Sequence, residues 1–277
     1  MRMLRYALLA VAVLCPSLAQ GSQWVQLMPG GGAEARLVTD AASCPPIVID
    51  NQAMAMTARA APDANFAVLL CSAPVPATAT SASIGGVNLP LAAAAPQRIL
   101  VFGDTGCRIT ATYIQACNDP KEWPFPQIAA EAALLKPDLV IHVGDYLYRE
   151  APCPPGNAAC AGSPSGDNWP AWAADFFTPA APLLAAAPWV FVRGNHEDCA
   201  RGGPGWLRLL GPLAFDPAAA CAAHLPPYAV PLGAMNLVVM DDADAPDPTV
   251  AADLVPDYRA DFAALATLAK PPLWLAF

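Results

Sequence analysis

The chain of 277 residues has little charge and almost no histidine. Only 13% of its residues are charged, and 14 Lys and Arg against 23 Asp and Glu give a net charge of −9. Because nucleic-acid phosphates are bound by Lys and Arg, this balance argues against nucleic acid as a partner. Beyond the first residues no apolar run approaches the ~20 residues that a bilayer span needs, so we expect no membrane segment in the mature protein.

The first 19 residues have the composition of a secretory signal peptide. Two arginines form a basic region, residues 6–14 are apolar, and Ser17-Leu18-Ala19 has the small-x-Ala pattern of a cleavage site. This order is typical of a signal that is removed after export. Cys15 resembles a lipoprotein cysteine, but bulky Val13 and Leu14 precede it, so we favour cleavage near Ala19. We therefore expect a periplasmic or secreted protein.

The cysteines indicate disulfides. Nine occur, eight of them after the signal, and no two form a Cys-x-x-Cys pair, which argues against a zinc ribbon. An even number in an exported chain favours disulfide bonds. Loop closure costs least between near neighbours, although spacing alone leaves other connectivities open. On that basis we predict the pairs Cys44–Cys71, Cys107–Cys117, Cys153–Cys160 and Cys199–Cys221.

Residues 20–95 predict a small β-rich N-terminal domain, either a β-sandwich or a β-rich cap. Short runs of strand-like residues alternate there with clusters of Gly, Pro, Asp and Ser, a pattern of strands and turns. The Ala/Pro stretch at 91–96 predicts a linker. Strands are expected at 35–39, 46–49, 66–70, 83–84 and 87–89.

From residue 96 to residue 277 the pattern predicts an α/β domain with a layered sheet and flanking helices. Buried parallel strands read as near-continuous aliphatic runs, and helices are expected at 127–136, in part of 169–184, where three prolines interrupt the pattern, and at 256–269. The last helix is expected to be amphipathic, with Tyr258, Phe262, Leu265 and Ala269 on one face. Strands are expected at 98–102, 139–143, 189–192, 228–231, 237–240 and 273–277.

Three short segments of similar form follow the first three of these strands. They are Gly103-Asp104-Thr105-Gly106, Gly144-Asp145-Tyr146-Leu147-Tyr148 and Gly194-Asn195-His196-Glu197. Ligands of open α/β sheets bind at the carboxyl ends of the strands, where these segments are expected to meet. Each alone is also consistent with a turn or a helix cap. Together and in this order they indicate a metal site.

The residue types suit a pair of hydrolytic cations. Asp and Asn provide hard oxygen ligands of the kind that Mn, Fe and Zn accept, and one carboxylate can bridge two cations ~3.5–4 Å apart. His196 suits a proton donor, and Glu197 is expected to orient its ring.

By these motifs the chain resembles the calcineurin-like metallophosphoesterases, and among them the purple acid phosphatases, which carry the three motifs in the same order. The resemblance covers about residues 98–277. It implies that Asp104 binds a first metal, that Asp145 bridges two metals, and that Asn195 binds the second. It also implies that His196 protonates the leaving group while a metal-bound hydroxide attacks a small-molecule phosphate ester, either a monoester or a diester.

One detail favours the purple acid branch. Most members of the superfamily have Asp-x-His in the first motif, whereas this chain has Asp104-Thr105-Gly106. Tyr148 offers a replacement ligand, and a phenolate favours Fe(III), which implies an Fe(III) ion paired with Zn, Fe or Mn. An ordinary aromatic at the sheet edge is the alternative for Tyr148.

The chain departs from the family in its C-terminal part. The family continues with Val-x-x-His and Gly-His-x-His, and neither is present in a chain with three His. We expect His142 to be a core residue and His224 to be a solvated loop residue, so the second metal is left with Asp145 and Asn195. We therefore expect a chain cut short, with weak metal binding and little turnover. The alternative is a non-catalytic exported binding protein that keeps the phosphoesterase fold.

Two other segments are expected to have structural roles. Asp241, Asp242 and Asp244 follow a strand and could bind a cation, but a strand-end turn or cap is favoured. Trp169, Trp172 and Phe176 occur at helical spacing and are expected to pack. No protein partner is indicated.

Overall fold

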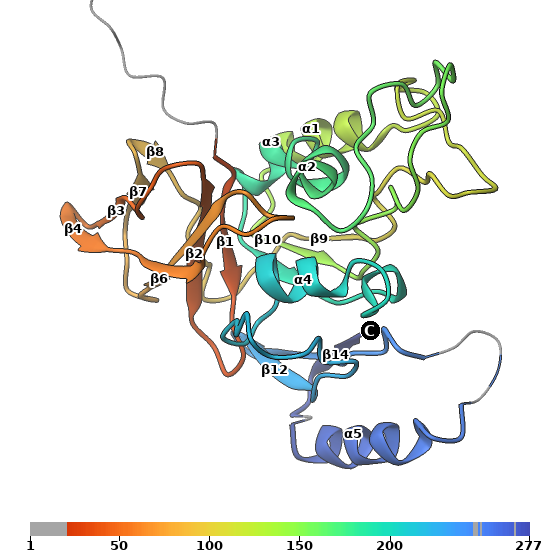
Figure 1. Cartoon of the computed structure of the whole chain (residues 1–277). Coiled ribbons are helices and arrows are strands. Elements are labelled where there is room, and N and C mark those ends of the chain that lie inside the picture. The colour runs from red at the N-terminus through yellow and green to blue at the C-terminus, as the bar shows by residue number, and fades with distance from the viewer. Residues whose placement is uncertain (1–20, 246–248, 250, 269) are drawn as a thin grey trace, which may run out of the picture.

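The computed structural model describes residues 21–245, 249, 251–268 and 270–277, so the expected signal peptide at 1–19 lies outside the described residues. Among the residues described, no helix is both long and apolar enough to cross a membrane. The fold is mixed α/β, built around a seven-stranded sheet in the order β5-β6-β2-β1-β11-β10-β9 (Figure 1).

The half of this sheet nearest the motifs is parallel. It consists of β9 (Ile99–Phe102), β10 (Leu139–His142) and β11 (Trp189–Phe191). Phe102 lies opposite His142, and His142 lies opposite Phe191. The three strands therefore end at the same level, and the loops that carry the three motifs begin side by side. All three strands were expected within one residue of these ends.

The other half of the sheet is made of N-terminal strands. β1 (Gln23–Leu27) pairs in parallel with β11, and three antiparallel strands follow, namely β2 (Ala33–Thr39), β6 (Leu69–Val75) and β5 (Thr57–Ala60). Strands from residues 20–95 and from residues 96–277 thus share one sheet. That residues 91–96 are a linker between two separately folding domains stays a prediction.

A four-stranded antiparallel sheet covers this N-terminal half. Its order is β4 (Gln52–Ala55), β3 (Pro46–Ile49), β7 (Ala82–Ile84) and β8 (Val87–Asn88). Apolar side chains of β1, β2 and β6 pack against those of β3 and β7 in one core cluster. The expected β-sandwich is therefore present, although one of its sheets continues into the α/β half.

One N-terminal strand lies elsewhere than expected, and three strands were not expected. The strand expected at 66–70 is β6 at 69–75, because the Asp63 carboxylate accepts hydrogen bonds from the backbone N–H groups of Asn65 and Phe66 and holds a turn there. The sequence patterns did not reveal β1, which carries two glutamines, nor the short and largely exposed strands β4 and β5.

Helices cover one face of the parallel strands. They are α1 (Phe125–Leu134), α2 (Trp169–Trp172), a π-helical turn (Ala173–Phe177), α3 (Ala181–Leu184) and α4 (Gly203–Leu209). Trp172 and Phe176 are fully buried in the core between these helices and the sheet, so the packing role expected for them is confirmed. The segment at 169–184 is helical in parts, as expected, but Pro170 lies in the first turn of α2, where a missing N–H costs nothing.

A three-stranded sheet packs on the opposite face. It contains β12 (Tyr228–Leu232), β13 (Met235–Val239) and β14 (Leu273–Ala276), with β14 at its edge and parallel to β13. Ile141 and Val190 of the large sheet pack against Val230 and Leu237 of the small one. Trp274 on the edge strand β14 is 47% exposed.

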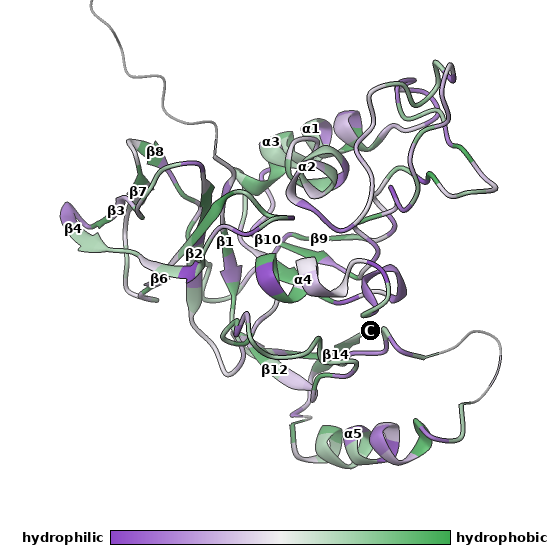
Figure 2. Ribbon diagram, viewed as in Figure 1, coloured by the Kyte–Doolittle hydropathy of each residue, from purple (hydrophilic) through white to green (hydrophobic). Residues whose placement is uncertain are grey.

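Helix α5 (Val255–Leu268) lies beyond the small sheet and corrects an expectation (Figure 1). Figure 2 shows hydrophilic and hydrophobic residues along its whole length rather than one clean apolar stripe. Phe262, expected on the buried face, is 58% exposed, whereas Asp261 is buried. Ala269 lies outside the described residues. A polar contact of Asp261, described below, decides which face turns inward.

All four predicted disulfides are present. Cys44–Cys71 joins the loop between β2 and β3 to β6, and Cys199–Cys221 ties the loop after the third motif to the segment before β12. Cys107–Cys117 and Cys153–Cys160 stabilise two neighbouring loops, which the Asn118 side chain joins by donating to the carbonyls of Ala158 and Ala161. These loops form the lobe beside β9 in Figure 1.

Candidate metal centre

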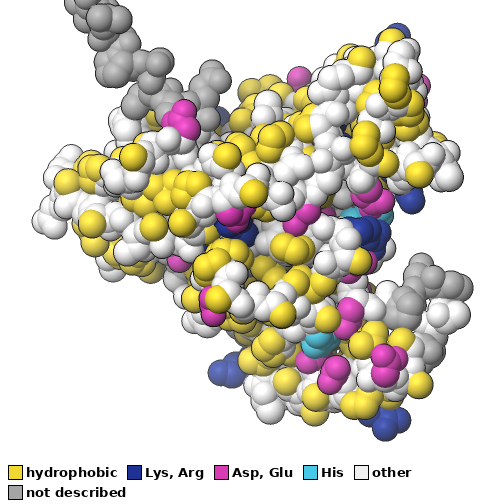
Figure 3. Space-filling model, viewed as in Figure 1, with side chains coloured by type: hydrophobic (Ala, Val, Ile, Leu, Met, Phe, Trp, Pro, Cys, Tyr) yellow, Lys and Arg dark blue, Asp and Glu magenta, His cyan; other side chains and the backbone are white. Residues whose placement is uncertain are grey.

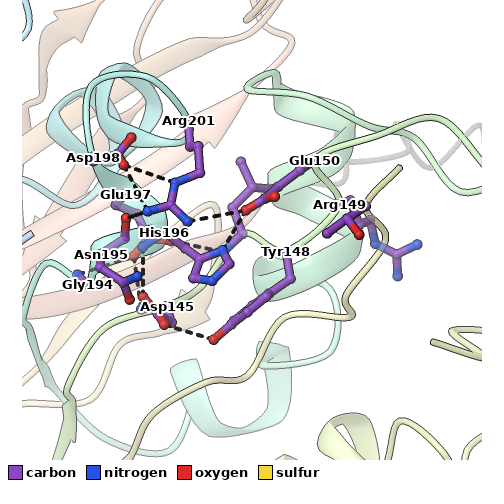
Figure 4. A network of polar contacts seen from close by, with 12 residues as sticks. Asp145, Tyr148, Arg149, Glu150, Gly194, Asn195, His196, Glu197, Asp198 and Arg201 are labelled. Atoms are coloured by element: carbon purple, nitrogen blue, oxygen red, sulfur yellow. Dashed lines mark hydrogen bonds and ion pairs between the residues drawn. The ribbon is translucent and has the colours of Figure 1, made fainter. Parts of the chain in front are cut away.

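The three motifs meet at the carboxyl ends of the parallel strands. The backbone N–H of Asp104 donates to Gly144 O at 3.1 Å, and that of Thr105 donates to Asp145 O at 3.1 Å, so the first two loops are joined directly. The backbone N–H of His196 donates to Asp145 Oδ1 at 3.0 Å, which joins the third loop to the second (Figure 4). The expected convergence of the three segments is therefore observed.

Glycine is needed where these loops touch. A Cβ on Gly194 would lie 2.2 Å from Asp145 Oδ1, and a Cβ on Gly144 would lie 2.5 Å from the Gly194 Cα. No larger residue fits at either position without moving a loop. Asp104 and Asp145 themselves have positive φ angles of 55° and 65°. This conformation is disfavoured for most side chains but tolerated by Asp, and here it holds both carboxylates at the sheet edge.

The predicted ligand side chains form one polar cluster. The Tyr148 hydroxyl lies 2.6 Å from Asp104 Oδ1 and 2.8 Å from Asp145 Oδ2. With its nitrogen turned toward the carboxylate, the Asn195 amide lies 3.3 and 3.1 Å from the two Asp145 oxygens. Figure 4 shows Asp145, Tyr148 and Asn195 pointing toward one another from two different loops.

The protein atoms of this cluster leave negative charge uncompensated. One hydroxyl carries one hydrogen, so Tyr148 can donate to only one of its two carboxylate neighbours at a time. Burial, reinforced by the hydrogen bond to Asp104 and the charge of Asp145, raises the pKa of the Tyr148 hydroxyl far above its ordinary value. Two carboxylates and a phenol so close together fit a cation, which neutralises the carboxylates and lowers the cost of ionising the phenol.

The donor set is unequal for two cations. Asp104, Asp145 and Tyr148 supply three oxygens at one position, whereas Asp145 and Asn195 alone supply the other. No group of three or more His, Cys, Asp or Glu side chains that could hold a metal ion occurs in the described residues. Counted by oxygen donors, the cluster fits a first cation bound by two carboxylates and a phenol, and it offers only two ligands to a second cation.

His196 lies against this cluster. It is buried, and its ring packs on Tyr148 with the centroids 3.9 Å apart. Its Nδ1 lies 2.6 Å from Glu150 Oε1, and the guanidinium of Arg201 lies 3.6 Å from the same oxygen. Glu150 thus fixes which ring nitrogen of His196 points away from the carboxylate.

The role expected for Glu197 is wrong. Glu197 is fully buried and its carboxylate accepts hydrogen bonds from the backbone N–H groups of Asp145, Tyr146 and Leu147 at 2.8–3.0 Å. Burial, with the nearby Asp145 charge, raises the pKa of Glu197 to about 8. Glu197 therefore holds the loop that carries Asp145, while Glu150 contacts His196. Glu150 follows Tyr148 by two residues, and in extended backbone this spacing places both side chains on the same side of the chain. That spacing could have indicated Glu150 as a neighbour of the cluster.

Asp175 is a second buried carboxylate that the sequence did not reveal. It comes from the π-helical turn, and its oxygens accept from the backbone N–H of Tyr148 at 2.8 Å and of Cys107 at 3.1 Å. It also pairs with the Arg149 Nε at 2.5 Å. Burial raises the pKa of Asp175 to about 6, against the opposing effect of Arg149. Asp175 therefore anchors the backbone on both sides of the cluster, and no local sequence pattern indicated it.

The two remaining histidines lie elsewhere. His142 is fully buried and its Nε2 lies 2.8 Å from Thr105 Oγ1, which confirms the expected core role. His224 was expected to be solvated, but it lies between Asp261, 2.5 Å from its Nε2, and Asp244, 3.4 Å from its Nδ1. This contact turns Asp261 inward on α5. Figure 3 shows histidine beside acidic side chains at the surface.

The acidic segment after β13 has a structural role. Asp241 pairs with Arg193 at 3.2 Å and accepts from the backbone N–H of Leu225 and Ala243. The preferred interpretation as a strand-end turn is therefore confirmed for Asp241.

The chain is thus an α/β protein with acidic loops at the carboxyl ends of its parallel strands, the edge at which open α/β sheets bind their ligands. A profile of the calcineurin-like phosphoesterase family matches residues 97–261, more than half of the chain. The chain belongs to this family. No curated protein sequence matches it significantly.

Two solved structures are similar to the chain. A purple acid phosphatase from yellow lupin (Lupinus luteus) seeds has a TM-score of 0.47 and 12% identity and covers 91% of this chain. The structure of PhoD has a TM-score of 0.38 and 14% identity and covers 82% of this chain. The chain spans about half the length of each, 50% and 52%. The family assignment depends on the profile match alone.

Proposed function

We propose that the chain is an exported, metal-dependent phosphoesterase that hydrolyses small-molecule phosphate esters. The observation that carries this proposal is the cluster of Asp104, Asp145 and Tyr148, joined by a single shared hydrogen. A site with this much negative charge suits cations, and cations suit the phosphoryl group of a substrate. Membership of a phosphoesterase family supports the same reaction class.

The proposed ligand roles are those that the resemblance to the purple acid phosphatases implies, and the contacts within the cluster support them. Asp104 and Tyr148 would hold one cation, Asp145 would bridge, and Asn195 would hold the second. A phenolate ligand favours Fe(III) at the first position with Zn, Fe or Mn at the second, as in a purple acid branch of the family. When bound, the cations supply charge neutralisation of the phosphoryl group and activation of the attacking water.

The chain's own residues supply positioning and a proton. His196 donates a proton to the leaving oxygen from the ring nitrogen not in contact with Glu150. Glu150 keeps the ring in that orientation. The exposed Asp104 carboxylate leaves this side of the cluster open to a substrate.

Export is supported by the four disulfides, since such bonds persist in oxidising compartments. We propose a periplasmic or secreted location on that basis. Free thiols at all eight positions in protein isolated from its native host would contradict it.

The two-ligand second site favours one alternative, a non-catalytic exported binding protein that keeps the phosphoesterase fold. Elemental analysis and turnover of 4-nitrophenyl phosphate separate the two. A phosphatase gives metal-dependent turnover that Asp145→Asn abolishes and that exposed Asp253→Asn leaves unchanged. Metal binding without turnover supports the alternative, and a protein that binds no metal contradicts the proposed centre.

Tyr148→Phe tests the branch. With Fe(III) bound, a phenolate ligand gives a visible charge-transfer absorption, and Tyr148→Phe removes it while leaving the two Asp carboxylates in place. An unchanged spectrum in the variant would exclude Tyr148 as a ligand.

A further inference from the structure

A cavity of about 640 Å³ adjoins the carboxylate cluster. Asp104 and Tyr148 belong to both the cavity wall and the cluster. Its other walls come from the loop closed by Cys107–Cys117 and from the start of α1. The volume lies within the ~300–1,000 Å³ typical of small-molecule sites.

The lining of this cavity is mostly aromatic and aliphatic. It includes Phe102, Tyr113, Trp123, Phe125 and Ile128. Tyr113 and Ile128 are 56% and 46% exposed, so apolar surface that burial would normally cover faces the cavity or solvent. Apolar surface of this kind next to a polar cluster is typical of ligand sites.

The wall is preformed rather than loose. The Trp123 indole N–H donates to Thr105 O at 2.9 Å, and the Arg149 guanidinium lies over the Trp123 ring at 5.2 Å. The Gln115 side chain donates to Glu122 O at 2.7 Å, which joins the loop that Cys107–Cys117 closes to the segment before α1. Little ordering of these side chains is needed on binding, which preserves the free energy gained by burying a ligand.

The cavity wall also contains an arginine, Arg108. Arg108 lines it and is exposed, with its guanidinium carbon 6.0 Å from the centroid of the Tyr148 ring. None of the ion pairs within the described part of the chain includes Arg108. A guanidinium beside the cluster suits the negative charge of a phosphate ester.

We propose that this cavity binds the organic group of the phosphate ester and that this group carries a flat aromatic ring. The inference rests on the proposed phosphoesterase function and deepens it. Tyr148 contacts the cluster, packs on His196 and lines the cavity. An ester held at the cluster can therefore place its leaving oxygen near His196 and extend its ring past Tyr148 among the aromatic side chains. Arg108 faces the phosphoryl end.

Two phosphonates that cannot be hydrolysed test the proposal by calorimetric titration of the Zn(II)-loaded protein. Phenylphosphonate and methylphosphonate share the anionic group and differ in the ring. We expect phenylphosphonate to bind about tenfold more tightly, because burying much of one ring contributes that order of affinity.

Matched variants locate the effect. Ile128→Ser, in the cavity, should reduce the ratio of the two affinities, whereas Leu134→Ser, on the same helix but 73% exposed and outside the cavity, should preserve it. Arg108→Gln should weaken both phosphonates about equally, and exposed Lys121→Gln should weaken neither. Far-ultraviolet circular dichroism confirms that each variant is folded.

The outcomes separate this inference from the proposed function. Equal affinity for the two phosphonates, with both lost in Asp145→Asn, overturns the aromatic subsite and leaves the phosphoesterase centre standing. An affinity ratio that Ile128→Ser does not change also overturns the subsite. Binding of neither phosphonate overturns both proposals.

Discussion

A buried neutral histidine should make this protein acid-sensitive. His142 is fully buried, its Nδ1 accepts from the backbone N–H of Gly144 at 3.3 Å, and its Nε2 faces Thr105 Oγ1 at 2.8 Å. A proton on Nδ1 would point at the Gly144 N–H instead of accepting from it. Burial lowers the pKa of His142 from its ordinary 6.5 to about 3.

The sign of the effect follows from proton binding. Between about pH 6.5 and pH 3 the unfolded chain holds a proton on this ring and the folded chain does not. The contribution of neutral His142 to the free energy of unfolding is therefore complete above about pH 6.5 and decreases as the pH is lowered. At pH 5 the pH lies about 1.5 units below the ordinary pKa of histidine, and one pKa unit corresponds to about 1.4 kcal/mol. Lowering the pH from 7.5 to 5 should therefore reduce the free energy of unfolding by about 2 kcal/mol through His142.

Urea unfolding of the wild type and of His142→Gln, after chelation with EDTA and with the disulfides intact, measures this loss. Carboxylates titrate in both proteins, so their contribution cancels in the difference between them. We expect His142→Gln to be less stable at pH 7.5, because the ring packing on Tyr146 is lost. The gap should narrow by about 2 kcal/mol at pH 5. A gap that stays constant with pH would refute the reasoning.

Three further predictions concern the carboxylates Asp175, Glu150 and Asp261. Asp175→Asn should lower the free energy of unfolding at pH 7 by about 3 kcal/mol, because it leaves the buried Arg149 without its partner; urea unfolding checks this, and a loss no larger than that of exposed Asp253→Asn would contradict it. Glu150→Gln should change the tautomer balance of His196, observed in the ¹⁵N shifts of its ring, while Glu122→Gln leaves these shifts unchanged; identical spectra would remove Glu150 from the role of positioning residue. Asp261→Asn should raise amide exchange across residues 255–268 about fivefold at pH 6, since it removes a partly exposed pair of about 1 kcal/mol. Burial lowers the pKa of His224, but its hydrogen bonds to Asp261 and Asp244 outweigh this and raise that pKa, so protection of α5, corrected for intrinsic exchange, should decline as the pH rises through it; pH-independent protection would refute this.

The sequence was informative where a local pattern and its structural consequence coincide. Runs of aliphatic residues predicted β9, β10 and β11, because strands buried on both faces must be apolar along their length. The disulfide pairs followed from short loop closures, which are the least costly in entropy. The three motifs predicted Asp104, Asp145, Tyr148 and Asn195 as the candidate cluster, and the structure brings these side chains together.

The sequence patterns did not predict which distant segments contact one another. Strand β1, with glutamines at two of its five positions, could not be distinguished from a loop, yet it joins the N-terminal strands to the parallel half by pairing with β11, 163 residues away at Gln26 and Trp189. The sequence pattern placed Phe262 on the buried face of α5, but the contact of Asp261 with His224 turns the other face inward. A hydrophobic pattern describes one helix, whereas the inward face depends on what lies opposite.

The sequence by itself therefore determined the family, the strands that carry the motifs and the residues of the candidate cluster, and it favoured the cysteine pairs that the structure contains. Only the tertiary structure decided how those residues are held. Glu197 supports the loop of Asp145, Glu150 contacts His196, and Asp175 anchors Tyr148 from a π-helical turn. The physical reason is that ligand types follow from local chemistry, while a buried carboxylate acquires its role from whichever N–H groups the folded chain brings to it.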